Sequence, residues 1–269
     1  RFNSCWRFAL NRLGTPLTGK PHPKFPNPTI LEAACEFTFV RDPEPRWSSG
    51  ELYKALGGEF PEIQPIGNMA LQIVIGTVAP PTPPRPLGVP APAFRFASQA
   101  GDRTIQISDT NFICTVSGVY PGWDTLKASI LKNWETILPI ILPREISKIG
   151  LRYINRIKKE AERPKLADWL RPTADLPATL LSSEGHFLAR IESTPDSNSL
   201  KLVTLANQEP TEDSPNGAII FDIDRIYNGS TVTDAAVIDS ILETLHDDIW
   251  DAFWGARTEA LEHKLKGGK

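Results

Sequence analysis

The chain has 269 residues, of which 41% are hydrophobic, and its formal net charge at pH 7 is -3. This length is sufficient for one large domain or two ordinary ones. No apolar run approaches the roughly 18 residues needed to span a membrane, so a membrane is not expected as a partner. Because the net charge is small and both signs are dispersed along the chain, we expect no large phosphate-binding surface, and nucleic acid is not favoured as a partner.

The three cysteines, Cys5, Cys35 and Cys114, form an odd set without the spacing of metal ligands. This pattern is typical of free, mostly buried thiols in a reducing compartment. We therefore expect a cytoplasmic protein, and nothing in the sequence calls for a cofactor.

The first part of the chain begins with an extension. Residues 1–20 mix arginines with aromatic residues and predict either a short amphipathic helix or a mobile extension. Prolines between residues 21 and 28 predict an extended surface segment. The alternation of apolar and polar residues over Ile30–Val40 then predicts a strand, with Cys35 and Phe37 on its buried face.

A capped helix and a proline-rich stretch follow. Ser48 precedes Glu51 by three residues, which is typical of a capping box, and Gly57-Gly58 predicts where this short helix stops. Met69–Val78 predicts a second strand. Closely spaced prolines over Ala79–Pro92 predict a stiff extended loop between strands rather than a ligand for a proline-reading domain.

Further strands and a long helix lead to the middle of the chain. The strands are predicted at Phe94–Ser98, Thr104–Ser108 and Phe112–Ser117, joined by connectors with hairpin turn chemistry. Trp123 opens a helix whose apolar residues recur near the helical period, and Pro139 and Pro143 are expected to end it.

The stretch Lys148–Ile157 predicts a central strand, because β-branched and aromatic residues alternate between two faces. Tyr153 and Asn155 fall on one face, while Arg152 and Arg156 fall on the other. Each face therefore mixes apolar residues with groups that make directional hydrogen bonds, which is unusual for an internal strand.

The second half again places strands before a long helix. Pro164–Leu176 is predicted to be a connection with one helical turn around Ala167–Leu170. Strands are predicted at Thr179–Ser183, His186–Ser193, Leu200–Ala206 and Ala218–Asn228. Thr233-Asp234 caps a last helix of about thirty residues, in which Gly255 is expected to mark a kink.

These elements predict an α+β protein in which a curved, largely antiparallel sheet packs on two long helices. We divide the chain into an N-terminal extension (residues 1–20), a first half (21–157), a connecting segment (158–178) and a second half with the long C-terminal helix (179–269). The two halves are expected to be similar.

Three stretches carry a family resemblance. They are Phe25–Ala33 with Cys35-Glu36-Phe37, the run Gly150–Arg156, and the ending with Leu245-His246-Asp247 and Phe253. Over residues 23–266 the chain resembles a sporadically distributed family of uncharacterised bacterial proteins, and the Arg-Tyr-x-Asn strand motif is the most specific part. Such a distribution is typical of accessory genes, so the resemblance implies a role such as antiviral defence and supplies no catalytic residues.

The Arg-Tyr-x-Asn strand supplies the candidate binding residues. Arg152 carries a rigid fork of donors that suits a carboxylate or a phosphate. One interpretation pairs Arg152 with a carboxylate of the first strand, Glu32 or Glu36, and lets Asn155 tie down a loop. The alternative is a binding site for a partner or a small anionic ligand, drawn from Arg152, Tyr153, Asn155, Arg156, Glu32 and Glu36.

Two other groups of residues suggest a metal or catalytic role. Asp222 and Asp224 share one face of a predicted strand and present the carboxylates that a divalent cation needs, although such acids are ordinary on the solvent face of an edge strand. His246 stands beside Asp247 on the last helix, but neighbouring residues of a helix point in different directions.

No acid/base pair, nucleophile set or phosphate loop stands out in the sequence. We therefore expect a non-enzymatic bacterial binding or interaction protein, with another protein as its partner and an accessory role in antiviral defence. One alternative is a metal-dependent hydrolase or nuclease using Asp222 and Asp224. The other is a sensor of a small anionic ligand that uses Arg152.

Overall fold

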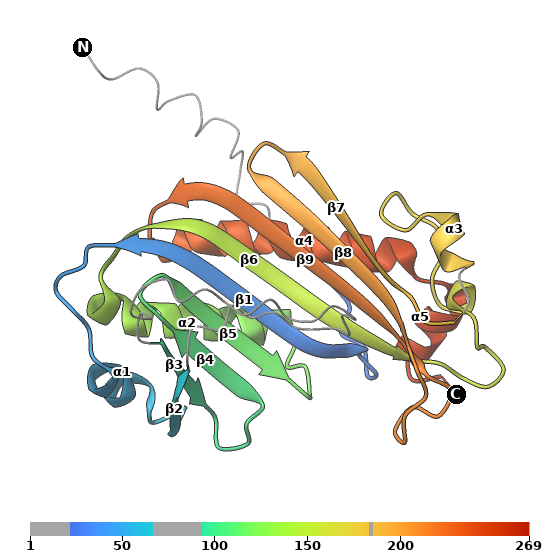
Figure 1. Cartoon of the computed structure of the whole chain (residues 1–269), viewed down its shortest axis with the longest axis horizontal. Coiled ribbons are helices and arrows are strands. Elements are labelled where there is room, and N and C mark those ends of the chain that lie inside the picture. Colours follow the sequence, from blue (N-terminus) through green and yellow to red (C-terminus); the bar gives the residue numbers. More distant parts are fainter. Residues whose placement is uncertain (1–21, 67–92, 183–184, 269) are drawn as a thin grey trace, which may run out of the picture. The chain divides into compact units, whose positions relative to one another are not determined.

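Nine strands form one open antiparallel sheet in the computed structural model, which describes residues 22–66, 93–182 and 185–268 (Figure 1). The strands are β1 (Ile30–Arg41), β2 (Glu62–Ile66), β3 (Ala93–Ala97), β4 (Arg103–Ile107), β5 (Asn111–Ser117), β6 (Pro143–Lys158), β7 (Leu188–Asp196), β8 (Ser199–Gln208) and β9 (Ala218–Thr231). Their order in the sheet is β2-β3-β4-β5-β1-β6-β9-β8-β7. The strand predicted at mid-chain, β6, is therefore internal, as expected.

The helices are α1 (Ser49–Leu56), α2 (Trp123–Ile141), α3 (Ala178–Leu181), α4 (Ala235–Ala256) and α5 (Glu259–Leu265), with a short 3-10 helix at Leu166–Asp168. The two long helices, α2 and α4, pack on the sheet. The α+β class and the largely antiparallel sheet with two long helices are thereby confirmed. The similarity of two halves stays a prediction. None of the helices in the described ranges is both long and apolar enough to cross a membrane.

The chain divides into two compact units, and three of the four boundaries between them fall inside strands β1, β6 and β9. Of the described residues, one unit takes in those up to Leu31, those within Gly150–Asn228 and those from Asp234 onward. The other takes in Glu32–Ile149 and Gly229–Thr233. Each unit has its own long helix, α4 in the first and α2 in the second.

An aromatic core lies between the strands and the helix of the α2 unit. Phe37 of β1 and Phe112 of β5 are partners in the antiparallel register, and the ring of Trp134 lies 5.0 Å and 5.6 Å from theirs. The next buried residues on the two strands, Cys35 and Cys114, are also register partners, and both thiols are free. The alternation of β1 thus places Ala33, Cys35, Phe37 and Phe39 in the core as predicted, whereas Leu31, expected on the same face, is exposed.

Two expectations for the helices of this unit have different outcomes. Ser48 and Glu51 do form the capping box at the start of α1, and Gly57 is its C-cap. The long helix does not stop at Pro139, which lies in the last turn of α2, but it does end at Ile141, just before Pro143. At the end of the helix, Leu142 adopts a left-handed conformation with φ of 48°.

In the other unit, the prediction of one kinked C-terminal helix of about thirty residues is wrong. The segment forms two helices, α4 and α5. The break lies at Arg257, whose backbone is extended, and not at Gly255. Segment 169–171 explains the break: the Arg171 N–H donates to the Ala256 carbonyl, and the Thr258 N–H donates to the Trp169 carbonyl.

One predicted strand of this unit is also wrong. Thr179–Ser183 was expected to be extended, but Ala178–Leu181 is a helical turn that follows Pro177 and buries Leu181. The proline suits a helix start because its fixed φ is helical. The edge strand β2 was not predicted, and the predictions for residues 1–20, Met69–Val78 and Ala79–Pro92 lie outside the described residues.

Candidate functional site

Strand β6 separates its motif residues onto two faces, as the alternation predicted. Tyr153 and Asn155 are buried on one face, each only 4% exposed. Arg152 and Arg156 lie on the opposite face and are half-buried. The motif therefore contributes to two different environments and not to one binding site.

Arg152 forms an ion pair with Asp222 of β9. The guanidinium donates from Nε to Oδ1 at 2.9 Å and from Nη2 to Oδ2 at 2.6 Å, and the Asp222 side chain is 4% exposed. The sequence pointed to Glu32 or Glu36, and not to Asp222, as the partner of Arg152. Strand β9 lies between β6 and β8, so the ordinary explanation of Asp222 and Asp224 as acids on an edge strand does not apply.

The ion pair bears on the metal site expected at Asp222 and Asp224. Both carboxylate oxygens of Asp222 already accept hydrogen bonds from Arg152, so a cation would have to displace a guanidinium from a nearly buried position. Asp224 is half-buried on the same strand. A metal role for these two acids stays a prediction, and the geometry around Asp222 does not favour it.

Asn155 ties down the segment that leads into β1, which is the role that one interpretation of the sequence gave it. Its Oδ1 accepts a hydrogen bond from Thr29 Oγ1 at 2.9 Å, and its Nδ2 donates to the Phe221 carbonyl at 3.3 Å. The Arg156 N–H donates to the Thr29 carbonyl at 2.7 Å. These bonds hold the end of segment 22–29 against β6.

The remaining predicted residues make local contacts. Arg156 donates to Gln208 and to both carboxylate oxygens of Asp213. The bonds from Arg156, with a further one from Lys158, hold the pKa of Asp213 below its usual range. In the other unit, Glu36 accepts hydrogen bonds from Lys148 and Asn111. Glu32 lies half-buried on β1.

A pocket of about 330 Å³ lies in the α4 unit and was not anticipated. Its walls come from β7, β8, β9, α4 and the segment at residues 173–175. The charged residues that line it are Asp175, Lys201, Arg225, Asp248 and Asp251. With two cations and three carboxylates, the pocket presents both signs of charge to any occupant.

Arg225 is the unusual residue of this pocket. Its side chain is 4% exposed, and Nε and Nη2 donate to Asp248 Oδ2 at 3.2 Å and 2.6 Å. Within the described part of the chain, its buried Nη1 meets no hydrogen-bond acceptor. The sequence carries a signal for it, because Arg225 occupies an inward position of β9, between Ile223 and Tyr227 in the apolar alternation.

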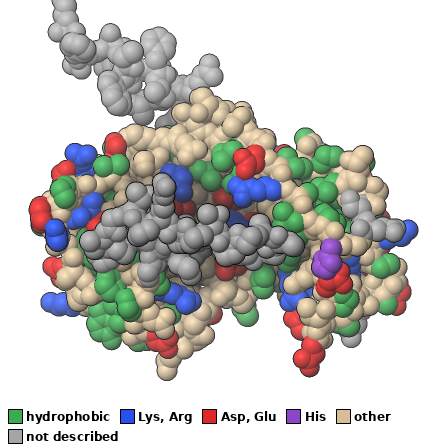
Figure 2. Space-filling view, viewed as in Figure 1, with side chains coloured by type: hydrophobic (Ala, Val, Ile, Leu, Met, Phe, Trp, Pro, Cys, Tyr) green, Lys and Arg blue, Asp and Glu red, His purple; other side chains and the backbone are tan. Residues whose placement is uncertain are grey.

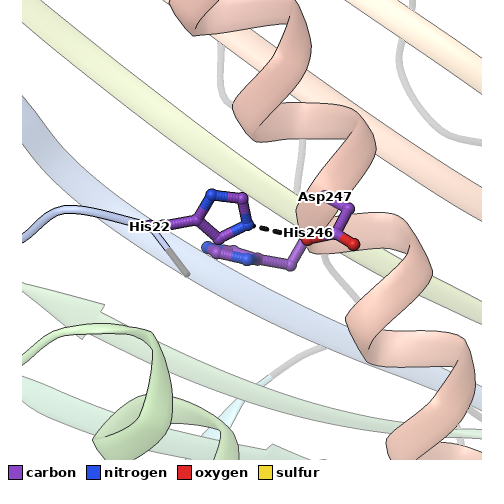
Figure 3. A group of neighbouring side chains, drawn as sticks. All are labelled: His22, His246 and Asp247. Atoms are coloured by element: carbon purple, nitrogen blue, oxygen red, sulfur yellow. Dashed lines mark hydrogen bonds and ion pairs between the residues drawn. The ribbon is translucent and has the colours of Figure 1, made fainter. Parts of the chain in front are cut away.

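A second group that the sequence did not assemble joins His22 to His246 and Asp247 of α4 (Figure 3). His22 Nε2 lies 2.7 Å from Asp247 Oδ1, and the rings of His22 and His246 meet edge-on with centroids 4.9 Å apart. The ring of Tyr153 lies 5.8 Å from that of His246. Although His246 and Asp247 are neighbours on one helix, a ligand atom of each lies within 4.8 Å of the other and of one on His22.

No protein-family model matches the chain, and no curated protein is similar to it in sequence. The family resemblance stays a prediction based on the motif residues, and the function has to be argued from the geometry of the sites.

Proposed function

We propose that this protein is a non-enzymatic binding protein that holds a small zwitterionic ligand, such as a free amino acid, in the pocket beside Arg225. One observation carries the proposal. A guanidinium buried at the wall of a pocket has a nitrogen without a hydrogen-bond acceptor among the described residues.

The unsatisfied nitrogen is costly for the protein alone. Leaving a buried donor without a partner costs about 1–3 kcal/mol, and more when the group is charged. Because Nη1 itself is buried, a small shift of the pocket wall has to expose it before a ligand carboxylate can supply the acceptor. The hydrogen bond gained, to a charged donor, is among the stronger ones in proteins. By contrast, Arg152 already donates two hydrogen bonds to Asp222. Arg225 is therefore the better candidate for the role that the sequence suggested for Arg152.

The charges of the pocket select the class of ligand. A ligand that carried only negative charge would meet the carboxylates of Asp175, Asp248 and Asp251 as well as the two cations. A ligand with an ammonium group next to its carboxylate matches both signs and avoids like-charge contacts. We therefore propose a zwitterionic ligand in place of the anionic ligand that the sequence suggested.

The size of the pocket and the pairing of its charges suit recognition of a small molecule. A volume of about 330 Å³ lies at the lower end of ligand pockets in proteins. Lys201 Nζ lies 2.5 Å from Asp175 Oδ2, so the second cation, like Arg225, is held by an acid from another element. Such pairs fix the positions of the charges before a ligand arrives, which reduces the ordering cost of binding.

The described residues on the face drawn in Figure 2 form no broad patch of one charge. On the face in Figure 2, Lys and Arg side chains alternate with Asp and Glu among the described residues. This dispersal supports a small-molecule ligand over nucleic acid. A protein partner and a role in antiviral defence stay predictions from the sequence.

The experiment is a titration calorimetry screen of the common amino acids, followed by two derivatives of the tightest binder. The methyl ester removes the negative charge, and the N-acetyl form removes the positive charge. We expect both derivatives to bind at least about tenfold more weakly, because each loses one charged hydrogen bond. The matched variants are Arg225→Met, which should lose binding, and Arg190→Met, which alters an exposed arginine of β7 and should keep it. Absence of any binding, or equal binding of the methyl ester, overturns the proposal.

A further inference from the structure

We propose that His22, His246 and Asp247 form a binding site for one transition-metal ion of the zinc type. Each residue offers one ligand atom, and the three atoms all lie within 4.8 Å of one another. Figure 3 shows His22 approaching from the segment before β1, while the other two side chains project from consecutive positions of α4. Within residues 22–66, 93–182 and 185–268, this is the one such group of three His, Cys, Asp or Glu side chains.

The separations are close to those of a coordination sphere. Ligand atoms at about 2.0–2.1 Å from a tetrahedral zinc ion lie roughly 3.3 Å from one another. His22 Nε2 and Asp247 Oδ1 are closer than this, at 2.7 Å, because a hydrogen bond joins them. An ion would replace the proton between these two atoms and draw the third ligand inward from a separation of up to 4.8 Å, a shift of at most about 1.5 Å that side-chain rotation can supply.

The site is shielded from water. The side chains of His22 and Asp247 are 11% and 19% exposed, and His246 is 5% exposed. The ring of Trp250 covers His22 with centroids 4.6 Å apart. Three ligands in such an environment lose less conformational entropy on binding an ion than exposed side chains would.

The donor set identifies the class of ion. Two imidazole nitrogens and one carboxylate oxygen suit Zn²⁺, Co²⁺, Ni²⁺ and Cu²⁺. Mg²⁺ and Ca²⁺ prefer sites built from oxygen ligands alone. Three protein ligands leave a fourth position of a zinc ion for water.

The ion would link two parts of the chain that are far apart in sequence. Segment 22–29 is fastened at its other end by the Thr29–Asn155 hydrogen bond, and the Asn27 N–H donates to the Leu265 carbonyl. At the His22 end, the hydrogen bond with Asp247 and ring contacts hold the segment to α4. A metal ion would convert this contact into a bond that resists separation of the segment from α4.

The test uses the full untagged chain, stripped of metal with a chelator that is then removed. Zn²⁺ is titrated by calorimetry, and Co²⁺ is added separately because its absorption spectrum reports coordination by nitrogen and oxygen. We expect one ion per chain, a rise in melting temperature with Zn²⁺ and no rise with Mg²⁺. Cu²⁺ should also quench the fluorescence of Trp250, which lies beside His22.

His22→Gln and Asp247→Asn should each weaken Zn²⁺ binding by at least about tenfold, since each removes one ligand. His186→Gln is the matched control, because His186 forms a histidine–carboxylate pair with Glu209 at 2.9 Å on an exposed surface. Its Zn²⁺ affinity should equal that of the wild type. Melting curves without metal show whether the variants are folded, so a loss of binding is not confused with unfolding. The proposal is overturned if the wild type does not bind Zn²⁺, or if His22→Gln binds it as tightly as the wild type.

Discussion

Arg152 and Asp222 meet side chain to side chain, through two parallel hydrogen bonds of 2.9 Å and 2.6 Å. The sequence placed these residues in separate candidate sites, one for an anion and one for a cation. The structure joins them on adjacent strands, β6 and β9, so that each satisfies the charge of the other. The pair is therefore part of the sheet, and the function has to be sought on other residues.

Removing one partner of this pair should destabilise the protein strongly. Arg152→Met leaves the carboxylate of Asp222 nearly buried without its guanidinium, and we expect the free energy of unfolding to fall by about 3 kcal/mol. Urea denaturation followed by circular dichroism measures this change. The double variant Arg152→Met with Asp222→Leu should recover most of the loss, because no buried charge remains. A double variant as unstable as the single one would contradict this account.

Asn155 and Thr29 should be energetically coupled. Asn155→Ala removes an acceptor for Thr29 and a donor to the Phe221 carbonyl, so we expect a loss of about 1–3 kcal/mol in the free energy of unfolding. Thr29→Val should cost less, and the double variant should cost less than the sum of the two by at least about 0.5 kcal/mol. Thr244→Val, whose hydroxyl bonds within its own helix, serves as a control that should add independently to Asn155→Ala. Full additivity of Thr29→Val and Asn155→Ala would show that the hydrogen bond does not hold the segment.

The stability of the α2 unit should fall at acid pH partly through Glu59. A hydrogen bond from Lys132, with a further one from Arg103, holds the pKa of Glu59 below its ordinary value of 4.5. Because the pKa is depressed in the folded state, the stabilisation is complete above pH 4.5 and is lost as the pH falls through the folded value. Glu59→Gln should therefore be less stable than the wild type at neutral pH, and the difference in the free energy of unfolding should shrink as the pH falls below 4.5. Urea denaturation at neutral pH and at about pH 3 tests this, and a difference that does not depend on pH would contradict it.

The two cysteines of the core should be unreactive in the folded protein. Burial raises the pKa of Cys114 to about 12 and raises that of Cys35 well above its ordinary value, so almost no thiolate forms near neutral pH. In a Cys5→Ser background, alkylation at pH 8 should be at least about a hundredfold slower for the native protein than for the urea-unfolded protein. Counting both thiols after unfolding is the control. Rapid labelling of either thiol in the native state would show that β1 and β5 do not bury them.

Local pattern predicted most strands, because a period of two residues leaves a direct trace in the sequence. Over Ala218–Asn228 the alternation located β9, and over Ile30–Val40 it located β1 and its buried face. The same pattern contained the signal of the pocket. Arg225 stands where an apolar residue is expected, and a buried charge at such a position indicates a functional site more often than an exposed one does.

The errors arose where distant segments decide the outcome. The break between α4 and α5 depends on backbone hydrogen bonds from segment 169–171, which no periodicity within the helix reveals. The partner of Arg152 depends on the strand order, and His22 meets Asp247 across 225 positions of the chain. A single sequence without tertiary contacts does not carry these pairings.

The central claim is that Arg225 receives a small zwitterionic ligand. A crystal structure of the protein soaked with its tightest-binding amino acid tests this claim most directly. We predict that the ligand carboxylate lies about 3 Å from the Arg225 guanidinium, with its ammonium group directed at the carboxylates of Asp175, Asp248 or Asp251. An amino acid bound elsewhere, or one that makes no hydrogen bond to Arg225, would contradict the claim.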